Sequence, residues 1–327
     1  MADSAVNSRH LLDPELAALA VAPMPLDANS LATSRALMAQ VAAQTASICT
    51  PGIERHQMHI DGGIEVGPIR LLHFHPTNSS DSRGPRPALL HFHPGGFVLG
   101  SPEMSIEPLE EIVTALGCEV FSVDYPLAPE ARYSQACAVG VAALRWLRSS
   151  AHDLDIDPAR IALIGESAGG GLATSVALDA RHAKGPPICG LVLLFPMLDD
   201  RSAIGEAHPY AGEFVWTRDK NHFGWSAWLG HPPGQERVSP AAAPARALAL
   251  DGLPPTFMAI GSLDLFIDDN LAFAQRLIRA GVSTELHVYP GAPHAFERIA
   301  TAHVTRSLKR DRIAALGRIF ERVGDLP

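Results

Sequence analysis

The chain has 327 residues, of which 47% are hydrophobic and 19% charged, and its formal net charge at pH 7 is −9. A chain of this length and composition can bury one large core and is neither disordered nor collagen-like. The negative charge, without any run of five or more basic residues, argues against nucleic acid or an anionic membrane as the main partner.

No segment of the sequence predicts a membrane span or a metal-binding cysteine cluster. The most apolar segment, residues 189–198, has about ten residues and is too short to cross a bilayer. The first twenty residues lack the basic start and apolar core of a signal peptide, so we expect a cytoplasmic protein. The cysteines at positions 49, 118, 137 and 189 form no C-x-x-C pair, which favours free thiols over a zinc or redox site.

In chain order, the predicted elements are those of an α/β protein. Residues 13–22 and 30–46 have helical spacing, and residues 65–76 and 85–93 are strand-like runs separated by a polar turn. Apolar strand-like runs then alternate with helical segments, the strands at 118–125, 160–165, 189–196, 255–261 and 284–290 and the helices at 134–150, 167–183, 269–280 and 302–322. This alternation predicts parallel crossovers and a sheet covered on both faces.

Residues 200–250 interrupt the alternation, because they contain no clear strand. Aromatic residues gather in this stretch, namely Tyr210, Phe214, Trp216, Phe223, Trp225 and Trp228. They are compatible with a small accessory core, and also with a lid or pocket wall that supplies apolar surface near a site.

Residues 165–169, "GESAG", match the pattern G-x-S-x-G between a predicted strand and a predicted helix. A serine at the top of such a sharp turn has strained backbone angles, and only small residues two positions before and after it allow the close approach of the helix and strand. The helix N-terminus behind it favours developing negative charge. We therefore expect Ser167 to be a nucleophile.

A serine nucleophile needs a histidine base and an orienting carboxylate, which in this strand–turn–helix arrangement follow it in the order acid, then histidine. His294 lies in a loop just beyond the predicted strand at 284–290, and the other histidines after the serine follow no strand end. Asp264 comes just after the strand at 255–261, whereas Asp268 and Asp269 are better suited to the start of the next helix. We predict His294 as the base and favour Asp264 over the other two as the acid.

With these residues assigned, the sequence resembles the hormone-sensitive-lipase-like esterases, the bacterial family IV branch of the α/β-hydrolases, over residues 86–300. Five motifs in one order carry the resemblance: "HPGGFVLGS" at 93–101, "SVDYPLAPE" at 122–130, "GESAGG" at 165–170, "DLFID" at 264–268 and "HAF" at 294–296. The resemblance assigns the same nucleophile, acid and base. Four positions depart from the family pattern, which has Gly, Arg, Asp and Gly where this chain has Pro94, Pro126, Glu166 and Ala295.

The resemblance implies an eight-stranded, mostly parallel sheet with helices on both faces and a helical cap. The cap corresponds to residues 1–45 and about 200–228, and the catalytic domain to residues 46–199 and 229–327. Members of the family often dimerise through the last strand of the sheet, which here is residues 284–290. The family's short- to medium-chain ester substrates are the expected small-molecule partners.

The predicted chemistry is ester hydrolysis through an acyl-enzyme, with no metal or organic cofactor. The tetrahedral oxyanion needs donors from the residue after the nucleophile and from the glycine loop, which we assign to the N–H groups of Ala168, Gly95 and Gly96. Pro94 offers no N–H, but the donors come from the later part of this loop.

Three other functions compete with this prediction. An amide- or formamide-cleaving hydrolase would use the same residues, and a non-catalytic ligand-binding member of the fold would usually have lost one of them. A metal hydrolase is suggested by the pairs His73-x-His75 and His91-x-His93, which lie on one strand face each. Neither pair is followed nearby by the further ligands that such a site needs.

Overall fold

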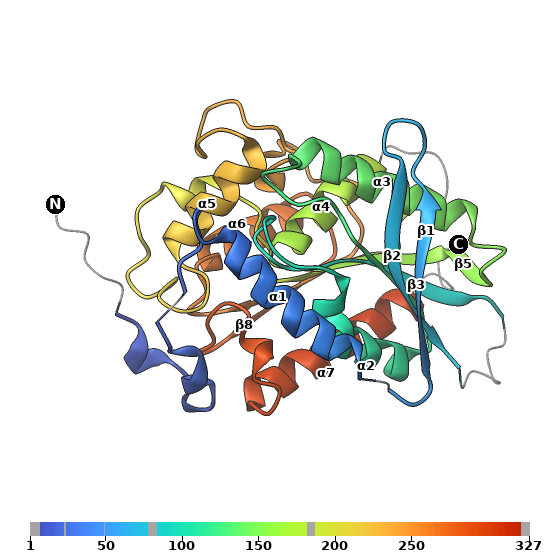
Figure 1. The fold of residues 1–327 in the computed structure, drawn as a ribbon, viewed down its shortest axis with the longest axis horizontal. Helices are drawn as coiled ribbons and strands as arrows, with labels where there is room; N and C mark the ends of the chain where they lie inside the picture. The colour runs from blue at the N-terminus through green and yellow to red at the C-terminus, as the bar shows by residue number, and fades with distance from the viewer. Residues whose placement is uncertain (1–6, 23, 49, 78–83, 182–186, 322–327) are drawn as a thin grey trace.

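An eight-stranded sheet with the order β1-β2-β4-β3-β5-β6-β7-β8 forms the centre of the molecule (Figure 1). The computed structural model describes residues 7–22, 24–48, 50–77, 84–181 and 187–321. The strands are β1 Ile53–Asp61, β2 Pro68–Pro76, β3 Arg86–Phe92, β4 Glu119–Val123, β5 Ile156–Glu166, β6 Gly190–Leu194, β7 Thr256–Gly261 and β8 Thr284–Tyr289. β1 pairs with β2, and β2 with β4, in antiparallel fashion, and all the other pairs are parallel.

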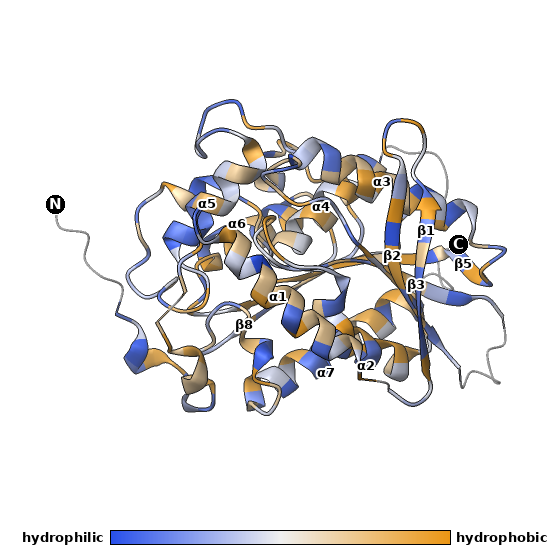
Figure 2. Cartoon of the chain, viewed as in Figure 1, coloured by the Kyte–Doolittle hydropathy of each residue, from blue (hydrophilic) through white to orange (hydrophobic). Residues whose placement is uncertain are grey.

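Helices cover both faces of this sheet (Figure 1). The α-helices are α1 Leu31–Ala46, α2 Ile106–Leu116, α3 Tyr133–Ser149, α4 Ala168–Ala180, α5 Arg218–Leu229, α6 Ile267–Arg279 and α7 His303–Glu321. α2 and α7 lie on one face of the sheet, and α3 and α4 on the other. Because the helices bury both faces, every residue of β4, β6 and β7 is buried, and the strands crossing the middle of the molecule are hydrophobic (Figure 2).

The predicted fold class and the central alternation of strands and helices are confirmed. The segment at 13–22 is a 3-10 helix, Pro14–Leu19, rather than an α-helix. The missed elements include β1, α2 and α5, the last of which lies in the 200–250 segment, where no individual helix was predicted. β1 carries polar side chains on both faces and is mostly exposed, so it lacks a strand-like pattern, and α2 has a proline in its first turn. Part of the polar turn between β2 and β3, at 78–83, lies outside the described residues.

The segments predicted as cap pack over the carboxyl ends of the central strands. Arg35 of α1 binds the carboxylate of Glu130 and donates to the carbonyl oxygens of Val98 and Ala128, at 2.9 and 2.8 Å. The main-chain N–H and the hydroxyl of Ser8 both donate to the carboxylate of Glu213. The N-terminal segment is thereby tied to the glycine loop and to the 200–228 segment.

Among the described residues, none of the helices combines the length and apolarity that crossing a bilayer requires. Cys118, Cys137 and Cys189 are free thiols, as predicted, and Cys49 lies outside the described residues. Burial raises the pKa of each of these three thiols to about 12.

Candidate active site

Ser167 stands at the turn between β5 and α4 with φ 53° and ψ −120°, outside the regions that residues other than glycine usually adopt. Such a conformation costs about 1–3 kcal/mol and persists only where the surroundings impose it. The Ser167 N–H donates to the Leu194 carbonyl oxygen at 2.9 Å, and the Ser167 carbonyl oxygen accepts from Met197 N–H at 2.9 Å. These two bonds to β6 and the segment after it hold the strained residue in place.

The two glycines of the motif are needed for close contacts on either side of this turn. A Cβ on Gly165 would lie 2.4 Å from the Gly169 carbonyl carbon, and a Cβ on Gly169 would lie 1.9 Å from the Phe92 carbonyl oxygen. Any larger residue would therefore push α4 away from β3 and β5. The spacing in the sequence follows from these contacts.

The structure brings the three predicted catalytic residues together in one hydrogen-bonded chain. Ser167 Oγ lies 2.9 Å from His294 Nε2, and His294 Nδ1 lies 2.7 Å from Asp264 Oδ2. The other carboxylate oxygen, Asp264 Oδ1, accepts from Phe266 N–H at 2.9 Å. Ser167, His294 and Asp264 are only 3%, 4% and 0% exposed, so the chain of hydrogen bonds is shielded from bulk water. This arrangement can move a proton from the serine hydroxyl to an oriented imidazole.

The two aspartates that were the weaker candidates for the acid lie elsewhere. Asp268 and Asp269 stand in the first turn of α6, as expected for carboxylates at a helix N-terminus, whereas the two ring nitrogens of His294 face Ser167 and Asp264. Burial, together with the nearby Asp199 carboxylate, raises the pKa of Asp269 to about 7. Only Asp264 therefore has the position that the base requires.

Aromatic rings surround the His294 imidazole. Phe195 and Phe266 meet it edge to face, with ring centroids 5.1 and 5.4 Å away, and the Trp216 ring is centred 6.1 Å away. Such an apolar shell limits the access of water and strengthens the electrostatic interactions within the site.

The predicted oxyanion donors lie in the loop after β3 and at the start of α4. Within the described residues, the N–H groups of Gly95, Gly96 and Ala168 donate to no protein acceptor in the structure, so they are available to a ligand. The Trp216 ring lies directly on Gly96, since a Cβ on that residue would be 2.1 Å from the ring. Pro94 precedes the donors, and its carbonyl oxygen is 2.9 Å from His93 Nδ1.

One of the departures from the family pattern, Glu166, has a clear structural partner. Glu166 lies 2.7 Å from His91 Nε2, and the other ring nitrogen of His91 lies 2.7 Å from Ser122 Oγ. Asp124, two residues before the departure at Pro126, pairs with Arg70 of β2 at 2.7 Å. The sequence identified His91 only as half of a metal-binding pair, and its pairing with Glu166 was missed because the two residues are 75 positions apart.

The departure at Ala295 concerns the backbone. Ala295 has φ 54°, a left-handed conformation that explains why glycine is usual at this position of the family.

His93 is fully buried, and burial lowers its pKa to about 4, so its ring is neutral at pH 7. Because His91 and His93 are engaged with different partners, they do not form the metal-binding pair that their spacing suggested.

Comparison with known proteins relates the chain to hydrolases over most of its length. A family profile described as the alpha/beta hydrolase fold matches residues 89–298. The chain is 32% identical over 238 residues to Esterase LipI of Mycobacterium tuberculosis, covering 72% of this chain and 73% of the relative. It is 31% identical over 280 residues to Carboxylesterase NlhH of the same organism, covering 84% of each. A solved structure of a bacterial heroin esterase superposes with a TM-score of 0.88 at 34% identity, covering 96% of this chain and 99% of that one.

Proposed function

The chain belongs to the α/β-hydrolase fold family, in its hormone-sensitive-lipase-like branch, and from this premise we propose that it is a serine carboxylesterase. The observation that carries the proposal is the strained, buried Ser167, whose hydroxyl lies 2.9 Å from the imidazole of His294. The esterases among its relatives support the same substrate class.

In the proposed mechanism His294 takes the hydroxyl proton as Ser167 Oγ attacks the ester carbonyl carbon, and a tetrahedral oxyanion forms. Asp264, bonded to the other ring nitrogen, stabilises the imidazolium and keeps the ring in the required tautomer. His294 then gives the proton to the leaving alkoxide, which departs as an alcohol and leaves an acyl-enzyme. Water, activated by the same imidazole, hydrolyses the acyl-enzyme and releases the carboxylic acid.

The N–H groups of Gly95, Gly96 and Ala168 are the proposed donors to the oxyanion. They belong to backbone that is buried or half-buried between β3, α4 and the aromatic residues of the cap, so they need no reorganisation when the negative charge develops. Each such donor contributes about 2.7–4 kcal/mol to the stabilisation of the transition state in enzymes of this kind.

The proposed substrates are short- to medium-chain esters, because the space over Gly96 is already bounded by Trp216. The indole is 7% exposed, and its Nε1–H donates to the buried Asn221 side chain at 3.3 Å, which fixes its orientation. With p-nitrophenyl esters of increasing acyl length, we expect kcat/KM to be highest for short acyl groups and to shift towards longer ones in Trp216→Ala. An unchanged dependence of kcat/KM on acyl length would show that residues other than Trp216 limit the length of the acyl group.

The proposal can be tested with a fluorophosphonate probe, which reacts with activated serines. We expect it to label the peptide containing Ser167 and to abolish hydrolysis of p-nitrophenyl acetate. Absence of both labelling and hydrolysis would instead favour a non-catalytic ligand-binding member of the fold. Initial rates on an aryl ester and on N-formylkynurenine separate an esterase from a formamide hydrolase.

We further propose that residues 1–45 and about 200–228 form the cap and that residues 46–199 and 229–327 form the catalytic domain. Within the described part, this division is supported by the packing of α5 on the glycine loop. A Cβ on Gly224 of α5 would lie 2.8 Å from the Gly96 carbonyl oxygen. The cap therefore contacts the predicted oxyanion donors directly.

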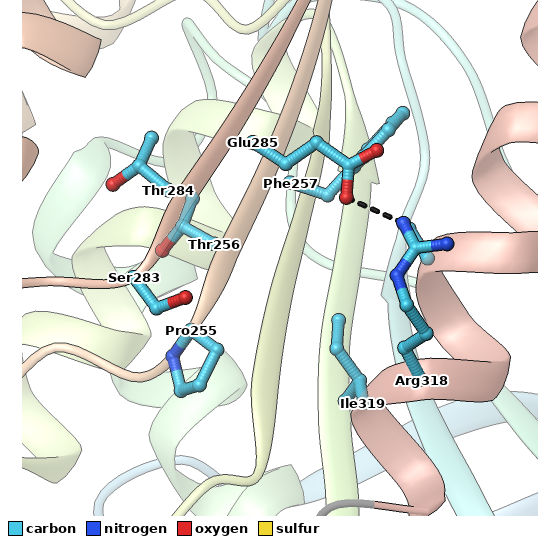
Figure 3. A pocket seen from close by; sticks show the side chains of 9 residues that line it. Pro255, Thr256, Phe257, Ser283, Thr284, Glu285, Arg318 and Ile319 are labelled. Carbon is cyan, nitrogen blue, oxygen red and sulfur yellow. Dashed lines mark hydrogen bonds and ion pairs between the residues drawn. The ribbon is translucent and has the colours of Figure 1, made fainter.

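A homodimer through β8 is proposed from the position of this strand at the edge of the sheet. β8 pairs only with β7 among the described strands, and Val288 on it is 44% exposed. Beside it, the Glu285–Arg318 ion pair connects β8 to α7 at the rim of a small pocket (Figure 3). We expect light scattering to give twice the chain mass and Val288→Glu to give the monomer mass. A monomeric wild-type protein would refute this interface.

A further inference from the structure

A second cluster of histidine and carboxylate side chains lies at the opposite edge of the sheet from β8. His73 and His75 of β2 project from the same face, and Glu119, the first residue of β4, precedes Val120, which the antiparallel register pairs with Phe74. The pair His73-x-His75 lacked a third ligand nearby in the sequence. The structure supplies one from 44 positions further along the chain.

The side chains of this cluster converge. His73 Nε2 lies 2.8 Å from Glu119 Oε2, and His75 Nδ1 lies 3.0 Å from Glu119 Oε1. The three potential ligand atoms, one from each residue, all lie within 4.8 Å of one another. Ligands of a tetrahedral zinc ion with bonds of about 2.1 Å are about 3.4 Å apart, so small movements of these three side chains would bring their ligand atoms to coordination distance.

The carboxylate of the cluster is buried and is held by a further side chain. The Glu119 side chain is only 2% exposed, and its carboxylate oxygens lie within 3.0 Å of nitrogen atoms of His73, His75 and Arg86. Arg86 Nη1 donates to Oε1 of Glu119 at 2.9 Å. It can hold that oxygen as an outer hydrogen-bond partner while Oε2 remains directed at His73, an arrangement usual around ligating carboxylates.

The cluster is ordered by packing and remains reachable from solvent. The His73 ring stacks on Phe121 with centroids 4.3 Å apart, and Phe121 meets Trp146 of α3. The His75 side chain is 34% exposed, which leaves a route for an ion. On β1, the register places Glu54 opposite His75 and His56 opposite His73, so a further ligand or a water molecule can complete the coordination.

We propose that His73, His75 and Glu119 bind a first-row transition-metal dication of the zinc type. Two imidazoles and one carboxylate are a ligand set that suits Zn²⁺, Co²⁺, Ni²⁺ or Cu²⁺, whereas Mg²⁺ and Ca²⁺ prefer oxygen ligands. The bound ion links β2 to β4. It lies at the amino end of β4, whereas the predicted nucleophile follows the carboxyl end of β5, so the ion takes no part in the proposed ester hydrolysis.

The test is calorimetric titration of the untagged, metal-free full-length protein with ZnCl₂. We expect one ion per chain and a fall in affinity of at least about tenfold in His75→Gln and in His73→Gln. His152→Gln is the matched control, because His152 is fully exposed on its side chain and remote in sequence from the cluster. Equal affinity in all three variants, or no binding by the wild type, would overturn the proposal.

A second measurement separates a built site from weak surface binding. Co²⁺ in a tetrahedral site of nitrogen and oxygen ligands gives intense visible absorption, which we expect in the wild type and in His152→Gln but not in His75→Gln. Zn²⁺ should also raise the melting temperature of the wild type and not that of His75→Gln, since an ion that binds only the folded state stabilises it. Esterase activity should be the same with and without a chelator. The metal-binding proposal and the proposed function can therefore fail independently of each other.

Discussion

The molecule contains two buried serine–histidine–carboxylate chains that meet at adjacent residues. In one, Ser167 Oγ, His294 and Asp264 are linked by contacts of 2.9 and 2.7 Å. In the other, Ser122 Oγ, His91 and Glu166 are linked by contacts of 2.7 and 2.7 Å. Glu166 directly precedes Ser167 in the sequence. Because both networks have the same kinds of residue and similar distances, these two features alone do not distinguish a catalytic triad from a structural hydrogen-bond network.

The surroundings of the two serines differ in three respects. Ser167 has φ 53° at a strand-to-helix turn, whereas Ser122 lies inside β4, paired with Leu72 and His91 on the neighbouring strands. Ser167 is followed by the helix N-terminus and the free N–H of Ala168, whereas Ser122 is followed by Val123, the last residue of the same buried strand. The order of ring nitrogens is also reversed, since Ser167 meets Nε2 and Ser122 meets Nδ1. The proposed reactivity therefore comes from the turn and the donors rather than from the hydrogen-bonded chain.

The largest effect is expected from removing the proposed nucleophile. Ser167→Ala should fold normally and lose p-nitrophenyl acetate hydrolysis by roughly four orders of magnitude or more, because no group remains to form the acyl-enzyme. Ser122→Ala is the matched control, a change of the same atoms in the other chain. Activity of Ser167→Ala within about tenfold of the wild type would show that Ser167 is not the nucleophile.

The second prediction concerns the proposed oxyanion donors beside Ser167. Gly96→Ala should lower kcat by about two orders of magnitude, the scale of one lost oxyanion donor, because the new methyl group meets Trp216 and displaces the loop. In Trp216→Ala, which removes that obstacle, the same substitution should cost less. Purely additive losses in the double variant would mean that Trp216 does not hold this loop in place.

A smaller effect on turnover is expected from Ser122→Ala. The change leaves His91 Nδ1 without its partner in a fully buried position, which should lower the free energy of unfolding by about 1–3 kcal/mol. We expect kcat/KM to stay within about threefold of the wild type, as measured beside urea denaturation curves. A loss of activity similar to that of Ser167→Ala would give the second chain a catalytic role.

The smallest effect on activity is expected at Glu297. Burial, together with the nearby Glu166 carboxylate, raises the pKa of this residue to about 7. The unfolded carboxyl group loses its proton near its ordinary value of 4.5, whereas the folded one keeps it until about pH 7. The folded state therefore binds more protons in this window, and the stability of the wild type should fall as the pH rises from about 5 to 8. In Glu297→Gln, the decrease in the free energy of unfolding between these two pH values should be smaller by about 1–3 kcal/mol, as measured from denaturation curves at each pH. Parallel pH profiles of stability in variant and wild type would contradict this interpretation.

Most of the network of Ser167, His294 and Asp264 could be predicted from the sequence. None of the network of Ser122, His91 and Glu166 could. Ser167 lies in a short motif whose glycines are required by contacts within five residues and with the neighbouring strand. Asp264 and His294 follow strand ends in the expected order, and parallel strands bring their carboxyl ends to one edge. His91, Ser122 and Glu166 carry no local pattern of this kind, because a strand serine and a strand histidine are ordinary residues until the register places them side by side.

The sequence by itself determined most of the strands and crossover helices, the strained serine turn and the order of acid and base, because these depend on short-range chemistry and periodicity. Only the tertiary structure decided which side chains meet across strands that are distant in the chain. That applies to the pairing of His91 with Glu166, to the Trp216 ring on Gly96, and to Glu119 between two histidines 44 and 46 positions away. The register between β2 and β4 is fixed by burial of their apolar faces, which no single segment of the sequence contains.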